Sequence, residues 1–155
     1  NMKRQSMKNR AETAVSKFSE GYNCAQSVFY SFCDDLHFDK NTALKMACGF
    51  GARMGRKGEV CGAVTGGIMV IGAKFGRGET DGETAKELTY QKTRELMDRF
   101  EKKHGTFTCR KLLHGCELTT EEGQKHFKAN NLSNAICQPC VRSVVEILDS
   151  IMELD

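Results

Sequence analysis

Apolar residues recur every three or four positions along most of the chain, which is the spacing of one face of an α-helix. Runs that alternate Val, Ile or Thr with polar residues are missing, so the sequence predicts an all-α protein. Residues that cap helix starts, and glycines that end helices, set the expected bounds of each helix. The predicted helices cover residues 6–19, 24 to about 34, 39 or 41 through 46, 60–75, 83 to about 103, 108–113, an element that begins within 119–122, and one that begins at Pro139.

The middle of the chain is rich in glycine: the stretch from Gly49 to Gly82 holds 11 of the 15 glycines. Within it, residues 60–75 predict an apolar helix that is shorter than the roughly twenty residues needed to cross a membrane. Each glycine costs a helix roughly 0.5 to 1 kcal/mol relative to alanine. Gly62, Gly66 and Gly67 therefore indicate a core helix that another helix or a ligand approaches closely, without membrane insertion.

Length and composition favour one compact domain over residues 1–155, a bundle of about six to eight helices around the glycine-rich helix. Residues 1–5 are expected to be disordered, with Asn1 a remnant of cloning. Hydrophobic residues make up 39% and charged residues 28%, and the net charge of +3 is too small to attract nucleic acid. No apolar run resembles a secretory signal, so we expect a cytoplasmic protein.

Five of the eight cysteines fall at predicted helix starts: Cys24, Cys61, Cys109, Cys137 and Cys140. Unpaired backbone N–H groups and the helix dipole favour an anion there, which lowers a thiol pKa and increases the fraction of reactive or metal-binding thiolate. Nearby cations add to this effect, and Arg53, Arg56 and Lys57 precede Cys61. Redox and metal-binding roles both remain open on this evidence.

Cysteine spacing limits the pairings. Cys137 and Cys140 form a C-x-x-C pair, close enough at a helix start for a disulfide. Cys109 and Cys116 would lie about 10 Å apart on one continuous helix, unless the chain breaks near Gly115.

The remaining cysteines are expected in the core. Cys33 lies nine residues after Cys24 and on the opposite side of the same helix, so these two cannot meet. We expect Cys33 and Cys48 to pack as small hydrophobic residues.

A metal site has weaker support in the sequence. Zinc sites usually show two closely spaced ligand pairs, and a second pair would need His114-Gly115-Cys116. No ferredoxin spacing occurs, although four converging cysteines could still bind an iron–sulfur cluster. His37, His104 and His126 are expected at the surface. A near match to the dinucleotide motif at Gly49–Gly55 follows no strand, which disfavours nucleotide binding.

Four segments together resemble a known family: Gly21-Tyr22-Asn23-Cys24-Ala25-Gln26-Ser27-Val28, Met54-Gly55-Arg56-Lys57-Gly58-Glu59-Val60-Cys61-Gly62-Ala63-Val64-Thr65-Gly66, Cys109-Arg110-Lys111-Leu112-Leu113, and Cys137. Their order and spacing are similar to those of the redox-active protein family named for its C-GCAxxG-C-C pattern. The block from Cys61 to Gly66 is the most specific part. The chain departs from the pattern by its extra cysteines Cys33, Cys48, Cys116 and Cys140, and by His114-Gly115 after the two leucines.

The resemblance implies a small, mainly bacterial helical protein with four defining cysteines, Cys24, Cys61, Cys109 and Cys137. It also implies genes that often lie beside transporter genes, and hence a redox partner connected with a transporter. The leading hypothesis is a thiol–disulfide oxidoreductase that needs no cofactor, in which Cys61 attacks and Cys24 resolves. The alternative is that the same four cysteines bind zinc or an iron–sulfur cluster without catalysis. A third hypothesis treats the thiols as inert parts of a structural module.

Overall fold

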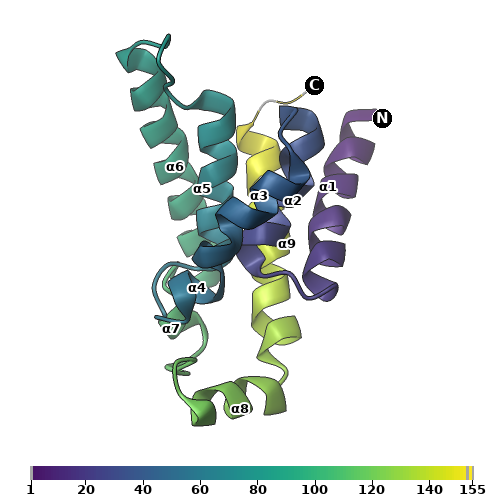
Figure 1. Ribbon diagram of the computed structural model, residues 1–155, viewed down its shortest axis with the longest axis vertical. Helices are drawn as coiled ribbons and strands as arrows, with labels where there is room; N and C mark the ends of the chain where they lie inside the picture. The colour runs from purple at the N-terminus through teal and green to yellow at the C-terminus, as the bar shows by residue number, and fades with distance from the viewer. Residues whose placement is uncertain (1, 153, 155) are drawn as a thin grey trace.

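The computed structural model describes residues 2–152 and 154, and this part of the chain is all-α (Figure 1). Within it, no segment forms a strand, and one isolated antiparallel bridge joins Val60 and Thr108. The helical segments are α1 (Met2–Ser19), α2 (Cys24–Leu36), α3 (Lys40–Ala47), the 3-10 turn η1 (Cys48–Phe50), α4 (Gly51–Gly55), α5 (Gly62–Phe75), α6 (Glu83–His104), α7 (Cys109–Leu112), α8 (Glu121–Ala129), the π-helix η2 (Ser133–Cys137) and α9 (Gln138–Ile151).

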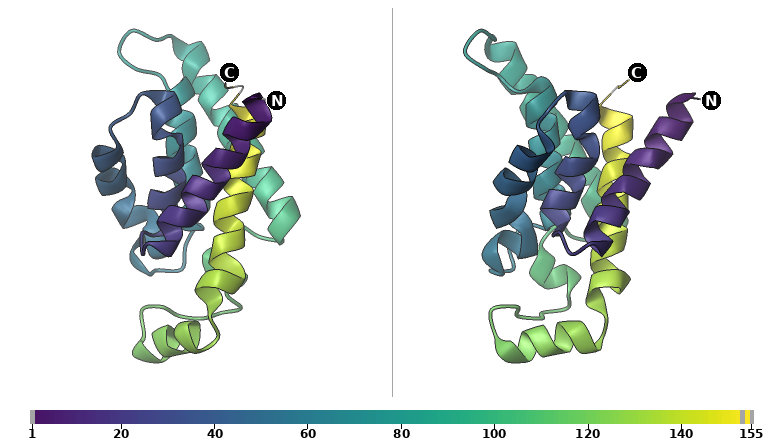
Figure 2. Two further views of the ribbon diagram at one scale, coloured as in Figure 1. Left: turned by 90° about the vertical axis from the view of Figure 1, so that its right-hand side faces the viewer. Right: turned by 45° about the vertical axis from the view of Figure 1, so that its right-hand side comes forward.

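Helix α5 is the centre of the bundle, as the glycine pattern predicts. It packs against α2, α6 and α9, while α1 packs against α2 and α9. Helix α8 lies apart from this body, at the end of the molecule away from both termini (Figures 1 and 2). None of the helices in the described part of the chain is both long and apolar enough to cross a membrane.

Side-chain caps fix the start of several helices where the sequence predicts them. The Asn23 side chain accepts a hydrogen bond from the backbone N–H of Gln26, whose side chain accepts one from the backbone N–H of Asn23. At the start of α3 the Asp39 side chain accepts a hydrogen bond from the backbone N–H of Thr42, and at the start of α8 the Thr120 side chain accepts one from the backbone N–H of Gly123.

The starts of α1 and α5 differ from the prediction. Helix α1 begins at Met2, four residues early, and includes four of the five residues expected to be disordered; Asn1 lies outside the described residues. Helix α5 begins at Gly62 instead of residue 60, because Cys61 is the non-helical cap residue. Helix α6 begins at Glu83 as predicted, directly after the cap residue Gly82.

Close helix contact explains the glycines of α5. A Cβ built on Gly67 would lie 2.8 Å from Leu96 Cδ2 on α6 and 2.9 Å from Val144 Cγ1 on α9. Such distances leave no room for a side chain. A Cβ built on Gly66 would lie similarly close to the backbone of α2. The two neighbouring glycines therefore let α2, α6 and α9 approach α5 closely.

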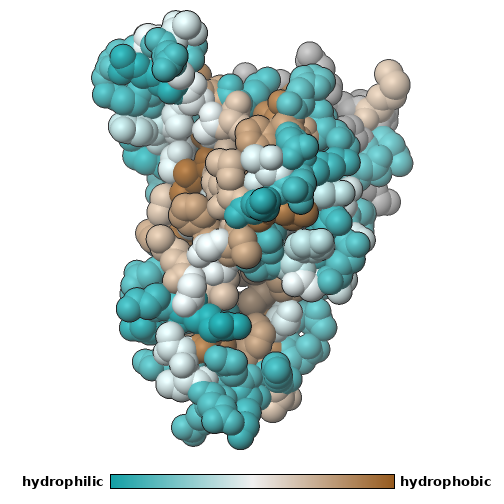
Figure 3. Space-filling model, viewed as in Figure 1, coloured by the Kyte–Doolittle hydropathy of each residue, from teal (hydrophilic) through white to brown (hydrophobic). Residues whose placement is uncertain are grey.

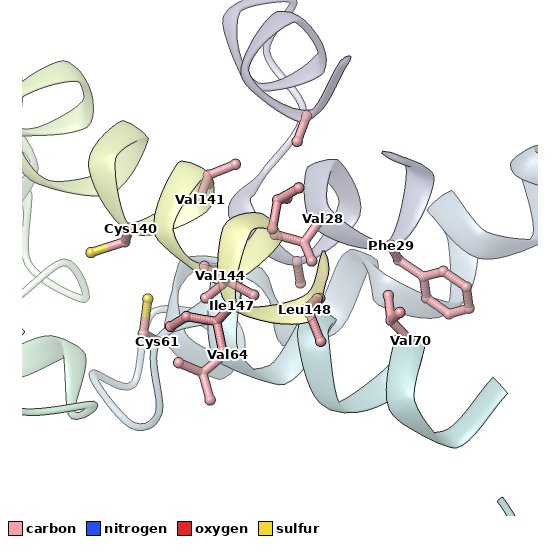
Figure 4. Packing of buried hydrophobic residues seen from close by; sticks show 14 of the residues in the cluster. Val28, Phe29, Cys61, Val64, Val70, Cys140, Val141, Val144, Ile147 and Leu148 are labelled. Carbon is pink, nitrogen blue, oxygen red and sulfur yellow. The ribbon is translucent and has the colours of Figure 1, made fainter. Parts of the chain in front are cut away.

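The core fills the space between α2, α5, α6 and α9. Figure 4 shows residues that α2, α5 and α9 contribute to it. Phe29, Val70 and Leu148 are fully or almost fully buried in it. On α6, Leu96 and Phe100 are fully buried, whereas Leu88 and Met97 are only half-buried.

A buried ion pair ties α1 to α9. Arg10 Nε donates to Asp149 Oδ1 at 2.6 Å, and Arg10 Nη1 donates to Asp35 Oδ2 on α2 at 3.2 Å. The Arg10 and Asp149 side chains are only 6% and 2% exposed. Because both side chains are largely removed from water, the loss of either one would leave the charge of the other less well compensated.

Candidate functional site: a cavity lined by five cysteines

A cavity of about 310 Å³ opens between α8 and the helix starts of the main body. Phe127 of α8 and Ile136 of η2 form part of its wall. In Figure 3, a small hydrophobic area near α8 is bordered by hydrophilic residues. Five cysteines line the cavity: Cys24, Cys61, Cys109, Cys137 and Cys140. The structure thus brings together the four cysteines selected from the sequence, and adds Cys140.

The first thiol pair joins α2 to η2. Cys24 is the first residue of α2, directly after the Asn23 cap, and its thiol is hydrogen bonded to Cys137. This bond and burial raise the pKa of Cys24 well above its ordinary value. The same hydrogen bond, together with the charge of Arg53, lowers the pKa of Cys137. Cys137 is therefore the more acidic sulfur of this pair, and Cys24 is the less acidic one.

The second group surrounds Cys61, the cap residue of α5. Hydrogen bonds from Cys109 and Cys140, and from the backbone N–H groups of Ala63 and Val64, hold the pKa of Cys61 well below its ordinary value despite burial. The pKa values of Cys109 and Cys140 are correspondingly raised. In Figure 4, the sulfur atoms of Cys61 and Cys140 lie together at one end of the core. Cys61 is the most acidic sulfur of this group.

Backbone hydrogen bonds fix Cys61 and Cys109 relative to each other. The Cys61 N–H donates to the Phe107 carbonyl at 2.9 Å, and the Cys109 N–H donates to the Glu59 carbonyl at 2.8 Å. These bonds flank the bridge between Val60 and Thr108. Two cysteines far apart in the sequence, at the starts of α5 and α7, are thereby held next to each other.

Arg53 is buried in the cavity wall with an incomplete set of partners. Its Nη2 lies 3.8 Å from Cys137 Sγ, and its guanidinium lies over the Phe127 ring at 5.6 Å. Its Nη1 is buried and has no hydrogen-bond partner among the described residues. The sequence places this arginine beside Cys61, but the structure places it beside Cys137.

The segment that carries Arg53 is a left-handed turn within α4. Ala52, Arg53 and Met54 have φ values of 47°, 64° and 64°. Side chains make this region costly by roughly 1 to 2 kcal/mol per residue. Such local strain is common at functional sites, where the surrounding fold maintains it.

The helix-start argument is wrong for Cys137 and Cys140. The π-helix η2 runs directly into α9, and the Gln138 N–H donates to the Ser133 carbonyl. Cys137 therefore lies within a continuous helical run and not at a free N-terminus. Its pKa is lowered by Cys24 and Arg53 instead of by a helix dipole.

Three cysteines do not line the cavity. Cys33 is buried as predicted, donates to the Phe29 carbonyl at 3.3 Å, and has a pKa raised by burial to about 11. Cys48 is exposed, contrary to prediction, because it lies in the surface turn η1. Cys116 follows the break at Gly115 and donates to the Gly123 carbonyl at 3.2 Å.

Histidines contribute little to the site. His37 and His126 are exposed as predicted, whereas His104 is half-buried, stacks on Phe100 and shares a hydrogen bond with Ser143 at 2.9 Å.

Within the described part of the chain, no three His, Cys, Asp or Glu side chains are placed as a metal-ligand set, and this includes His114 with Cys116. The cavity sulfurs form one pair, Cys24 with Cys137, and one group of three, in which Cys109 and Cys140 both interact with Cys61.

Fold and site together define a small all-α protein with clustered thiols. The model of a family described as "Putative redox-active protein (C_GCAxxG_C_C)" matches residues 22–151, and the chain belongs to this family. The comparison with curated proteins and the comparison with solved structures gave no significant match.

Proposed function

We propose that the protein is a thiol–disulfide redox protein with two working pairs, Cys61 with Cys109 and Cys137 with Cys24. One observation carries this proposal: each pair combines a sulfur whose pKa is lowered with a thiol that is hydrogen bonded to it. Attack requires a thiolate, and resolution requires a second thiol close by. Each pair meets both requirements.

The reaction at each pair is an exchange with an external disulfide. The thiolate attacks one substrate sulfur, forms a mixed disulfide and releases the other substrate sulfur as a thiolate. The neighbouring thiol then loses its proton and attacks the mixed disulfide, which releases the second substrate sulfur and closes the internal disulfide. Two electrons pass from the two cysteine sulfurs to the substrate, and the proton goes to a released thiolate or to water.

The proposed partner of Cys61 is Cys109, in place of the Cys24 expected from the sequence. Cys109 is the strongest influence on the pKa of Cys61, and the Val60–Thr108 bridge holds their segments together. Cys140 also reaches Cys61 and lies one helical turn from Cys137, so it can pass a disulfide between the two pairs.

Metal binding by the same cysteines is the alternative. It has less support because no set of three metal-ligating side chains is found among the described residues. The cytoplasm is the proposed compartment, because all eight cysteines are free in this fold and a reducing environment keeps them so.

Disulfide mapping tests the proposal. The reduced protein is equilibrated with a glutathione redox buffer, blocked with an alkylating reagent and digested for mass spectrometry. We expect reversible loss of four thiols and the linkages 61–109 and 24–137. Cys109→Ser should abolish the first linkage only, Cys24→Ser the second only, and Cys48→Ser neither. Eight thiols that stay reduced under oxidising buffer, or bound metal at one equivalent or more in the anaerobically purified protein, would overturn it.

A further inference from the structure

Apart from the cysteines, the charged side chains that line the cavity are all cationic among the described residues. Arg53 lies in its wall, and Arg56 and Lys128 are exposed at its edge. Among the described residues that line it, there is no Asp or Glu. Two thiolates need at most two of these cations, so a positive charge remains for a ligand.

The buried guanidinium has unused hydrogen-bonding capacity. Arg53 is 3% exposed, contacts Cys137 through Nη2, and has no hydrogen-bond partner for Nη1 in the part of the chain that the structure describes. A buried donor without a partner costs free energy that an incoming acceptor can recover. A carboxylate is well suited, because arginine binds it through two parallel hydrogen bonds.

The size and walls of the cavity restrict the remainder of the ligand. A volume of about 310 Å³ is at the lower end of the range for small-molecule pockets. Apolar side chains such as Leu112, Phe127 and Ile136 supply much of the wall. These features suit a compact molecule with short apolar segments and exclude a folded protein from the cavity itself.

We propose that the cavity binds small organic disulfides that carry a carboxylate, and that Arg53 places this carboxylate beside Cys137. The inference rests on the proposed function and adds the substrate class. Cys137 attacks the substrate sulfur and releases one thiolate-carboxylate fragment. Cys24 then resolves the mixed disulfide, which releases the second fragment as a thiol and leaves a Cys24–Cys137 disulfide. Lys128 and Arg56 attract the anion to the opening.

Three disulfides of nearly equal length test the charge preference: dithiodiglycolate, 2-hydroxyethyl disulfide and cystamine, which are anionic, neutral and cationic. The rate of Cys24–Cys137 disulfide formation is measured by rapid quenching with alkylating reagent and mass spectrometry. Each rate is divided by the rate of the same disulfide with a small neutral thiol in solution. We expect the anion to exceed the neutral compound by about tenfold, the size of one charge-assisted hydrogen bond, and the cation to be slowest.

Charge variants show whether the cavity causes this order. Arg53→Gln should bring the anion-to-neutral ratio close to one, and Arg53→Lys should restore part of it. If Arg53→Gln does not fold, Lys128→Gln and Arg56→Gln, both at exposed positions, should each lower the ratio. Arg94→Gln, an exposed charge on α6 outside the cavity, should leave it unchanged.

The outcomes separate this inference from the proposed function. Equal normalised rates for all three disulfides, with the Cys24–Cys137 linkage still formed, would overturn the substrate class alone. Failure of every disulfide to form that linkage would overturn the function itself. A ratio that Arg94→Gln lowers as much as Lys128→Gln would assign the preference to overall charge and overturn the role of the cavity.

Discussion

Gly66 on α5 lies directly against the backbone of Ala25 on α2: a Cβ built on Gly66 would fall 2.6 Å from the Ala25 carbonyl oxygen. Backbone atoms cannot turn aside as a flexible side chain can. Gly66→Ala should therefore push α2 and α5 apart and lower the free energy of unfolding by about 1 to 3 kcal/mol. Denaturant unfolding of the variant measures the loss.

Gly72 provides the matched control on the same helix. A Cβ at this position meets nothing within 4 Å. Gly72→Ala should stabilise the protein by about 0.5 to 1 kcal/mol, because alanine is the better helix former. A Gly66→Ala variant as stable as Gly72→Ala would contradict the close contact between α2 and α5.

The pH dependence of alkylation should identify the two thiolates. Only the thiolate reacts, so a lowered pKa moves the inflection of the rate below the ordinary value of about 8.5. We expect such inflections for Cys61 and Cys137, and inflections above that value for Cys24, Cys109 and Cys140. Peptide mapping after iodoacetamide pulses from pH 5 to 10 gives each profile. The shape of the profile, and not the absolute rate, is decisive, because burial slows all five. An inflection above 8.5 at Cys61 would show that desolvation outweighs its hydrogen bonds.

Removal of the Arg53 charge should act on Cys137 more than on Cys61. Arg53 lowers the pKa of Cys137 by its charge and by a hydrogen bond, whereas the leading influences on Cys61 are Cys109 and Cys140. In Arg53→Gln, the alkylation inflection of Cys137 should move to higher pH, and that of Cys61 should stay nearly constant. Arg53→Lys should restore part of the Cys137 shift. Equal shifts at both cysteines would indicate a general disturbance of the cavity.

The Arg10–Asp149 pair should contribute strongly to stability. Asp149→Asn keeps the shape of the side chain but removes one of the two carboxylates that compensate the buried Arg10 charge, while Asp35 remains, so we expect a loss of about 1.5 to 3 kcal/mol in the free energy of unfolding. Glu12→Gln is the control, because Glu12 also joins α1 to α9, through an exposed ion pair with Arg142 at 3.0 Å. Exposed pairs contribute less than about 1 kcal/mol. Similar losses in the two variants would contradict the dependence on burial.

Local signals in the sequence were sufficient for most of the helices. Asn23, Asp39 and Thr120 cap their helices through side-chain hydrogen bonds that involve neighbouring residues only, so the helix starts can be predicted without the fold. The selection of Cys24, Cys61, Cys109 and Cys137 followed from the family pattern, and placement at a helix start supported it for Cys24, Cys61 and Cys109 but not for Cys137.

The interactions within the site could not be predicted in this way, because they depend on tertiary structure. The π-helix at Ser133–Cys137 turns Cys137 toward Cys24 and leaves no mark in the hydrophobic pattern. Left-handed backbone at three consecutive residues other than glycine directs Arg53 inward, and sequence propensities oppose that conformation. Cys48 was expected to be buried because nothing in the sequence marks η1 as a surface turn.

The short backbone bridge at Val60 and Thr108 also affects the thermodynamics of oxidation. Cys61 and Cys109 are 48 positions apart in the sequence, and closing a loop of that length costs an unfolded chain about 4 kcal/mol in entropy. In the folded protein this cost has already been met, so each thiol meets the other at a high effective concentration. A disulfide between them should therefore form without repacking of the helices, and its reduction potential should rise toward that of an unconstrained thiol pair when denaturant removes the bridge.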